Sequence, residues 1–383
     1  MKVAATLCSA ALLILAGWPR PPASQGPAWA GHTGEPIPFG VAEWKTNFKK
    51  HSVHLGEIRS GGPPKDGIPA IGHPVFESVA AAGAWLKPHE AVIAFDHTGG
   101  ARAYPLQILL WHEIVNDTIG GLAVAITFCP LCNTAIVFDR RLDGRILDFG
   151  TTGKLRWSDL IMYDRQTESW WQQITGEAIV GELTGRRLSV LPAQIISWNA
   201  FRLSAPHGQV LSRRTGFQRP YGRNPYAGYD AIGNAPFYYV GPRDKRLPAM
   251  ERVVTVSLEG EDVAYPFSEL ARARVVHDTV ADTQIVVFYE PGTASALHRA
   301  EVAAGRDVGA GGVFAPSLDG RRLTFRLRNG RIIDTESGSA WTILGEAASG
   351  PYRGKRLTPL VHGNHLWFSW AVFKPQTRIW RAR

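Results

Sequence analysis

Two cysteines separated by two residues are the most reactive pair in this sequence of 383 residues. Cys129 and Cys132 stand in the run Phe-Cys-Pro-Leu-Cys-Asn-Thr at 128–134, between two short apolar runs. The third cysteine, Cys8, lies in an N-terminal segment that we expect to be removed. A close cysteine pair of this kind is a redox couple, a structural disulfide or half of a metal site.

The residues after Cys132 help to choose among these roles. Thiol–disulfide oxidoreductases place the cysteine pair at the N-terminus of a helix, whose dipole lowers the thiol pKa. Here the run Asn-Thr-Ala-Ile-Val-Phe-Asp at 133–139 predicts a strand, so the pair is expected at the tip of a β-hairpin. Such a turn presents two thiolates to one metal, and Asn133 tolerates the left-handed conformation that it often requires. The pattern favours a metal half-site, then a redox-active pair, then a structural disulfide.

An internal repeat relates two long segments, roughly 91–206 and 252–376. The run Ala-Tyr-Pro occurs at 103–105 and 264–266, a shift of 264 − 103 = 161. Gly-Glu-Ala occurs at 176–178 and 345–347, a shift of 345 − 176 = 169. This period predicts a tandem duplication of one unit, because solenoid and propeller repeats are shorter. At the first shift Cys129 and Cys132 fall on Glu290 and Thr293, so only the first copy carries thiols.

The second copy has a pair of histidines that the first copy lacks. His362 and His365 stand where the first unit has Ala193 and Ile196. If the units pack about a pseudo-twofold axis, Cys129, Cys132, His362 and His365 form one composite site suited to zinc or copper. Alternatively, the two histidines are loop residues beside an aromatic core segment.

His112 and Glu113 are nearer candidate partners. They lie in a helix predicted over 106–115 and align with Ala273 and Arg274. A histidine and an acid found only in the cysteine-bearing unit suggest two roles. One residue binds a metal while the other hydrogen-bonds to it, or one of them acts as a base beside a thiol. A histidine bonded to a backbone carbonyl is the alternative. Together with Cys129 and Cys132 they are the candidate catalytic residues. The carboxylates Asp159, Asp164 and Glu168, near Trp170 and Trp171, are less informative, and we expect those kept in both copies to hold the fold.

The elements that must position these residues are short. Apolar and alternating runs predict strands at 92–95, 101–104, 123–128, 135–138, 146–149 and 160–163, and a short helix at 198–201. With 40 glycines and 26 prolines marking turns, the expected fold is β-rich α+β, a tandem duplication of one mixed unit with few short helices. The expected order is a signal peptide at 1–30, an extension packing on the first unit at 31–90, the first unit at 91–212, a linker at 213–250 and the second unit at 251–383. The tyrosine-rich linker either caps the unit interface or contacts a ligand.

The N-terminal residues and the net charge indicate the cellular location of the protein and the class of its partner. Lys2, an apolar run at 10–16 and Ala-Trp-Ala at 28–30 predict a cleaved secretory signal, with an uncleaved anchor as the alternative. We therefore expect a protein that is soluble after signal removal, in the periplasm or secreted. The net charge of +9 is carried by scattered arginines without a basic run, which argues against nucleic acid. A small molecule or a metal ion is the expected partner, and the residues do not indicate an oligomeric state.

Four motifs carry a resemblance to a known family. They are Trp-His-Glu-Ile-Val-Asn-Asp at 111–117, Phe-Cys-Pro-Leu-Cys-Asn-Thr at 128–134, Ser-Asp-Leu-Ile-Met-Tyr-Asp-Arg at 158–165 and Thr-Glu-Ser-Trp-Trp-Gln-Gln at 167–173. With the tyrosine-rich linker, they resemble an exported bacterial family filed as a domain of unknown function. The resemblance implies export and no particular activity. The leading hypothesis is an exported transition-metal binder. The alternatives are a periplasmic thiol–disulfide oxidoreductase and a non-enzymatic binding module with a structural disulfide.

Overall fold

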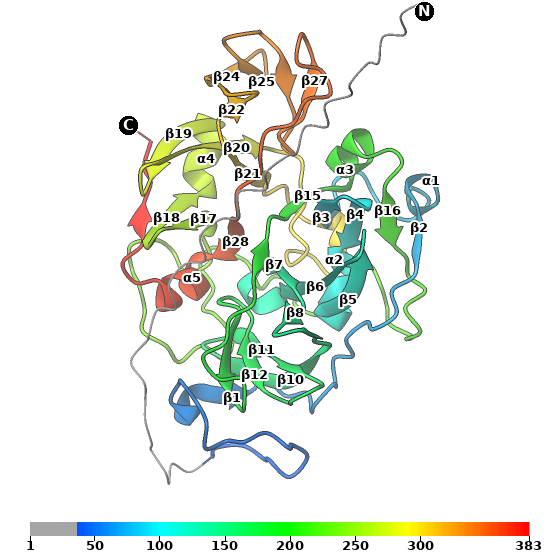
Figure 1. The fold of residues 1–383 in the computed structure, drawn as a ribbon, viewed down its shortest axis with the longest axis vertical. Coiled ribbons are helices and arrows are strands. Elements are labelled where there is room, and N and C mark those ends of the chain that lie inside the picture. The colour runs from blue at the N-terminus through cyan, green and yellow to red at the C-terminus, as the bar shows by residue number, and fades with distance from the viewer. Residues whose placement is uncertain (1–36, 383) are drawn as a thin grey trace, which may run out of the picture.

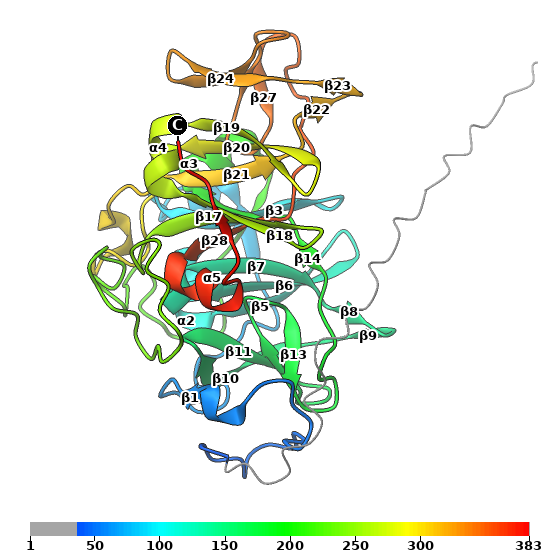
Figure 2. The same cartoon turned by 90° about the vertical axis from the view of Figure 1, so that its left-hand side faces the viewer.

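The computed structural model describes residues 37–382 and is rich in strands (Figure 1). Five short α-helices occur in this part of the chain, which confirms the expected β-rich α+β class. None of the helices within residues 37–382 has the length and apolar character needed to cross a membrane. The predicted signal peptide lies outside the described residues. The sheets are stacked along the long axis of the molecule (Figure 2).

The first half begins with a sheet in the order β15-β3-β4-β16-β2. Strands β3 and β4 form a hairpin, and Pro105 then caps helix α2. The bounds are β2 Phe76–Ser78, α1 Val79–Ala82, β3 Ala91–His97, β4 Gly100–Pro105, α2 Leu106–His112, β15 Gln194–Ser197, α3 Trp198–Ser204 and β16 Gln209–Leu211.

The second sheet carries the cysteine turn and has the order β14-β7-β6-β5. Strand β6 is buried along its whole length, which explains its continuous apolar run. The third sheet, ordered β1-β10-β11-β12-β13, lies next to it. The bounds are β1 Ile58–Ser60, β5 Ile114–Ile119, β6 Leu122–Cys129, β7 Thr134–Asp139, β8 Arg141–Leu142, β9 Arg145–Ile146, β10 Phe149–Arg156, β11 Asp159–Asp164, β12 Trp170–Gln172, β13 Glu177–Val180 and β14 Val190–Leu191.

Two sequence predictions of local structure were wrong at their edges. The helix expected over 106–115 ends at His112, because Glu113 has φ 57° and ψ −31° and the β-branched Val115 lies in the buried strand β5. Glu113 is therefore outside the helix. The strand expected over 146–149 is divided, since β9 ends at Ile146 and β10 starts at Phe149.

The second half repeats the order of elements of the first. Its sheet β28-β17-β18-β29 corresponds to β15-β3-β4-β16, and it continues with β19-β20-β21 and β24-β25-β26-β27. The bounds are β17 Arg252–Leu258, β18 Glu261–Pro266, α4 Phe267–Ala273, β19 Val275–Val280, β20 Thr283–Glu290, β21 Ala310–Phe314, β22 Ser317–Leu318, β23 Arg321–Arg322, β24 Phe325–Arg328, β25 Arg331–Asp334, β26 Ala340–Trp341, β27 Ala347–Ser349, β28 Gly363–Leu366, α5 Trp367–Phe373 and β29 Arg378–Ile379.

Side-chain hydrogen bonds recur at the same places in the two halves. The Tyr104 hydroxyl donates to Asp117 at 2.6 Å, and the Tyr265 hydroxyl donates to Asp278 at 2.7 Å. The indole of Trp171 donates to Asp164 at 2.9 Å, as that of Trp341 does to Asp334 at 2.8 Å. These bonds join corresponding strands in each half. Residues found in both halves therefore stabilise the arrangement of strands that the halves share.

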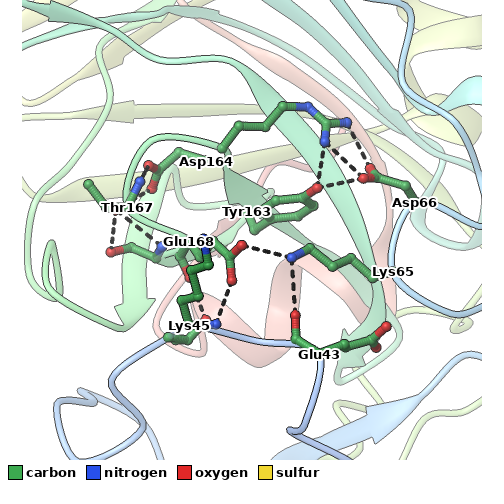
Figure 3. A network of polar contacts seen from close by, with 11 residues as sticks. Glu43, Lys45, Lys65, Asp66, Tyr163, Asp164, Thr167 and Glu168 are labelled. Carbon is green, nitrogen blue, oxygen red and sulfur yellow. Dashed lines mark hydrogen bonds and ion pairs between the residues drawn. The ribbon is translucent and has the colours of Figure 1, made fainter.

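A polar network fastens the N-terminal extension to the third sheet (Figure 3). Lys65 Nζ lies 2.9 Å from a Glu168 carboxylate oxygen and 4.3 Å above the Trp44 ring. The neighbouring Asp66 accepts a hydrogen bond from the Tyr163 hydroxyl at 2.5 Å. These contacts join the extension to β11, which begins with Asp159, and to the turn that follows it.

Candidate metal centre

The two cysteines lie at the tip of the hairpin formed by β6 and β7. Cys129 ends β6, a single 3₁₀ turn spans Pro130–Cys132, and β7 begins at Thr134. Asn133 has φ 49° and ψ 33°, so it adopts the left-handed conformation expected from the sequence. The pair therefore lies in a β-turn as predicted, and not at the start of a long helix.

The carboxyl group of Asp159 forms a close cluster with the two cysteine thiols. The two sulfur atoms and a carboxylate oxygen of Asp159 lie within 4.8 Å of one another, and all three residues are buried. Both cysteines are free thiols, and both Sγ atoms point to the Ser158 carbonyl oxygen, at 3.8 and 3.4 Å. Among residues 37–382, no other group of three or more histidine, cysteine or acidic side chains has ligand atoms close enough to share one metal ion.

The turn between β10 and β11 brings Asp159 to the cysteines. Arg156 pairs with Asp159, so Trp157 and Ser158 form a two-residue turn, with φ values of 53° and 70°. Turns of this hand usually contain asparagine and glycine, and each non-glycine residue costs about 1–2 kcal/mol there. Local contacts offset that strain. The Ser158 hydroxyl donates to the Phe237 carbonyl at 2.6 Å, and the Arg156 guanidinium stacks 3.7 Å from the Trp157 ring.

One oxygen of Asp159 is held and the other is free of hydrogen bonds. Oδ2 accepts from the Gln172 side-chain amide at 2.6 Å and from the Ile174 backbone N–H at 3.0 Å. Oδ1 is buried and has no hydrogen-bond partner in the described structure. Burial raises the pKa of Asp159 to about 7, although the Ile174 N–H, the Gln172 amide and the two cysteine thiols lower it in part. A carboxylate oriented through one oxygen with the other unpaired is suited to bind a cation.

Glu113 adds a second buried carboxyl to the same region. Burial is the main cause that raises its pKa to about 8, and the charge of Asp159 raises it further. Burial also raises the pKa of the Cys129 and Cys132 thiols, and Asp159 adds to both shifts. Within residues 37–382 neither Glu113 nor Asp159 forms an ion pair with a basic side chain. The region therefore contains two thiols and two carboxyl groups whose ionised forms are disfavoured by burial.

Part of the tyrosine-rich linker covers the cysteine turn. We call residues 219–239 the strap. The Tyr229 hydroxyl donates to the Leu131 carbonyl at 2.9 Å, and the ring of Tyr229 is buried in the core cluster that contains both cysteines. Tyr226 lies near Glu113 and Cys129, whose charges, after burial, raise its pKa. The strap thus encloses the site from the side of the linker.

His112 is engaged on both ring nitrogens outside the cysteine group. Its Nδ1 lies 2.7 Å from the Pro69 carbonyl oxygen, and its Nε2 lies 2.6 Å from the Tyr221 hydroxyl. Burial lowers the pKa of His112 to about 4. The ring is therefore neutral near pH 7, with Nδ1–H donating to Pro69 and Nε2 accepting from Tyr221.

The structure brings His365 to the cysteine hairpin but not into the three-residue group. His365 Nδ1 lies 2.8 Å from the Thr134 hydroxyl, and its ring stacks on Trp370 at a centroid distance of 5.2 Å. His362 Nδ1 lies 2.8 Å from the Leu360 carbonyl oxygen, whereas its buried Nε2 has no partner among the described residues. Burial lowers the pKa of His365 to about 3, so it too is neutral.

Comparison with known proteins agrees with the motifs. Residues 65–377 match the model of a family described as protein of unknown function DUF3179. The chain belongs to this family. The match contains the cysteine turn, Asp159 and the strap. No curated protein and no solved structure matches this DUF3179 chain.

Asp159 is the residue of this candidate site that the sequence patterns did not single out. It was grouped with Asp164 and Glu168 as a carboxylate near two tryptophans, but those two residues serve the frame. Asp164 accepts the Trp171 indole N–H, and Glu168 binds Lys65. One signal in the sequence could have separated Asp159 from them. At the shift of 170 that relates Asp164 to Asp334, Asp159 falls on Asn329 and is not kept in the second copy.

Proposed function

We propose that this protein binds a transition metal, zinc or copper, through Cys129, Cys132 and Asp159. The observation that supports it is the buried group of two thiols and one carboxylate within 4.8 Å, with one Asp159 oxygen unpaired. Soft thiolates suit zinc and copper, and a carboxylate is an accepted third ligand for zinc.

The electrostatics of the region support a bound cation. Burial opposes ionisation of both thiols and of the two nearby carboxyl groups, because each isolated charge is poorly solvated there. A divalent cation reverses this penalty and favours the ionised ligands, so metal binding releases protons. Glu113, which is outside the close group, adds negative charge that favours a cation without being a ligand.

Three protein ligands leave one position of a tetrahedral zinc ion for another group. His362 and His365 remain the candidates from the sequence for a composite site. Water or a small molecule is the other occupant, and in that case the ion can polarise the bound molecule.

Elemental analysis of protein purified from its native compartment tests the proposal. We expect about one zinc or copper ion per chain in the wild type and a loss of most of it in Cys129→Ser and in Asp159→Asn. Asp143→Asn is the matched control, because Asp143 is an exposed acid paired with Arg186 in a surface turn. Substoichiometric metal that is unaffected by Cys129→Ser would contradict the proposal.

A thiol–disulfide oxidoreductase is the second candidate, favoured by the two free thiols in one turn. Reaction requires a thiolate that a partner can reach. Both thiols are buried and their pKa values are raised, so this function requires movement of the strap. Trapping with Cys132→Ser tests it, since an active Cys129 would then retain its partner as a mixed disulfide. The absence of mixed disulfides would exclude this function.

The proposed setting is the periplasm or the exterior of the cell, after cleavage of residues 1–30. N-terminal sequencing of the mature protein is expected to begin at Gly31, and an intact N-terminus would contradict cleavage. We also propose that the two halves arose by duplication of one unit. The shared order of sheets and the recurring tyrosine–aspartate and tryptophan–aspartate hydrogen bonds support it. Failure of 91–206 to superpose on 252–376 over their shared strands would contradict the duplication.

A further inference from the structure

A pocket in the second half occupies the place that corresponds to the cysteine site. It has a volume of about 790 Å³ and lies between α3 of the first half and strands β25–β27 of the second. Its lining includes Glu290, Pro291 and Gly292. At the shift of 161 residues these positions match Cys129, Pro130 and Leu131, so the pocket adjoins the second copy of the cysteine turn.

Beside this pocket, the backbone of Arg274 has nearly the same conformation as that of Glu113, its counterpart in the first half. Arg274 has φ 63° and ψ −34°, close to the values of Glu113. The N–H of Glu113 donates to Leu109 at 2.8 Å, and the N–H of Arg274 donates to Leu270 at 2.7 Å. The carbonyl oxygens of Glu113 and Arg274 accept from Phe128 and Tyr289, at 2.8 and 2.9 Å. The two halves therefore have the same backbone geometry at this position, but the side chain is acidic in the first half (Glu113) and basic in the second (Arg274).

A second arginine of the pocket lies in the neighbouring hairpin. Asp159 is the first residue of β11, after the left-handed turn of Trp157 and Ser158. Arg331 is the first residue of β25, after the left-handed turn of Asn329 and Gly330, in a hairpin with shorter strands. Asp159 falls on Asn329 at the shift of 170, so Arg331 is not its aligned counterpart, but both residues directly follow the turn of their hairpin.

The arginines of the pocket form no ion pair within residues 37–382, although the charge of Arg274 partly offsets the effect of burial, which raises the pKa of nearby Glu290. Arg274 donates through Nε to the Tyr289 carbonyl at 3.1 Å, and its two Nη atoms have no hydrogen-bond partner within residues 37–382. The Arg331 side chain has no hydrogen bond or ion pair in that range. Arg202 bonds only to the neutral side chain of Asn199, at 2.8 and 3.1 Å. Glu290 is the acidic residue of the lining and forms no ion pair there.

We propose that this pocket binds a small organic oxyanion, a carboxylate or phosphate compound, with Arg274 and Arg331 as its main contacts. Guanidinium groups form paired, charge-assisted hydrogen bonds with both kinds of oxyanion. The volume lies within the range of small-molecule sites. Trp341 and Thr342 supply an apolar wall and a hydroxyl. The chain thus has a cation site in one half and an anion site at the corresponding place in the other.

Calorimetric titration of the full mature chain at low ionic strength tests this proposal. Citrate probes the carboxylate source and pyrophosphate probes the phosphate source. We expect at least one probe to bind with a Kd below about 1 mM, and Arg274→Gln or Arg331→Gln to weaken it about tenfold each. Arg322→Gln is the control, because it removes the same charge from an exposed strand outside the pocket. Unchanged unfolding temperatures establish that all three variants fold.

Each outcome decides the proposal. Binding of citrate, of pyrophosphate or of both, weakened by the two pocket variants and not by Arg322→Gln, supports it and identifies the oxyanion. No heat of binding from either probe at about 10 mM overturns it. Equal weakening by all three variants also overturns it, because only the net charge of the protein would then matter.

Discussion

The Thr134 hydroxyl and His365 Nδ1 lie 2.8 Å apart, and this bond joins the cysteine hairpin of the first half to strand β28 of the second. Both residues are buried. The Thr134 hydroxyl also donates to the Cys132 carbonyl oxygen at 3.3 Å, so it lies between the histidine and the cysteine turn. The second half therefore supports the strand that follows Cys132, although its histidines lie outside the close group of ligands.

Thr134→Val should destabilise the protein by about 1–3 kcal/mol, because it leaves a buried imidazole nitrogen without its partner. Urea unfolding followed by circular dichroism measures the loss. Thr283→Val, at a partly exposed position of β20, should change the free energy of unfolding by less than about 0.5 kcal/mol. Equal losses in the two variants would show that the bond to His365 contributes nothing.

Glu113→Gln should weaken zinc binding about tenfold while one ion per chain is retained, because Glu113 favours the cation by charge without being a ligand. Competition with a chromogenic chelator measures the affinity. Glu182→Gln, which removes an exposed carboxylate paired with Lys50, serves as the control. Complete loss of metal from Glu113→Gln would instead make Glu113 a ligand.

Removal of metal should be controlled by the strap. Tyr229→Phe deletes the hydroxyl that donates to Leu131, so the strap opens more often and a chelator should extract the metal several-fold faster. The amount of bound metal should not change. Tyr352→Phe, on a partly buried tyrosine of the second half, should leave the rate as in the wild type. A rate that is the same in both variants would mean that the ion leaves by another route.

His112 should make the fold sensitive to mild acid. Burial lowers its pKa from the ordinary value of 6.5 to about 4 in the folded chain, so the unfolded chain binds the proton first as the pH falls. The stability from neutral His112 is fully present above pH 6.5 and is lost between pH 6.5 and about 4. The loss amounts to roughly 3 kcal/mol at most.

His112→Gln keeps a donor for Pro69 and an acceptor for Tyr221, so it should flatten the fall in stability over that pH range. Urea unfolding at several pH values between those limits measures the slope. His207→Gln, at an exposed position, should keep the slope of the wild type. An unchanged slope in His112→Gln would assign the acid sensitivity to other groups.

Local patterns in the sequence predicted much of the fold and the cysteine turn. The run at 123–128 lies within β6, and the left-handed Asn133 closes the turn as expected. Such features depend on neighbouring residues, so the sequence carries them directly. Glu113 was misplaced because a helix pattern does not show the left-handed residue at which the helix stops.

The third member of the site could not be found in this way. Asp159 reaches the cysteines through a turn of Trp157 and Ser158, and propensity rules disfavour both residues at positive φ. That conformation depends on distant groups, including the Phe237 carbonyl that accepts from Ser158. Long-range contacts of this kind appear only once the chain is folded, and they also place the strap over the turn.

Enclosure by the strap has a consequence for how a metal would be used. Leu131 accepts the Tyr229 hydroxyl directly beside Cys132, so an ion bound there would lie behind this contact. Carriers that deliver metal to other proteins present their ligands at an accessible surface. An ion kept behind the strap would instead stay with the same molecule throughout its lifetime. It would be a permanent cofactor of this protein and not a metal that the protein delivers to others.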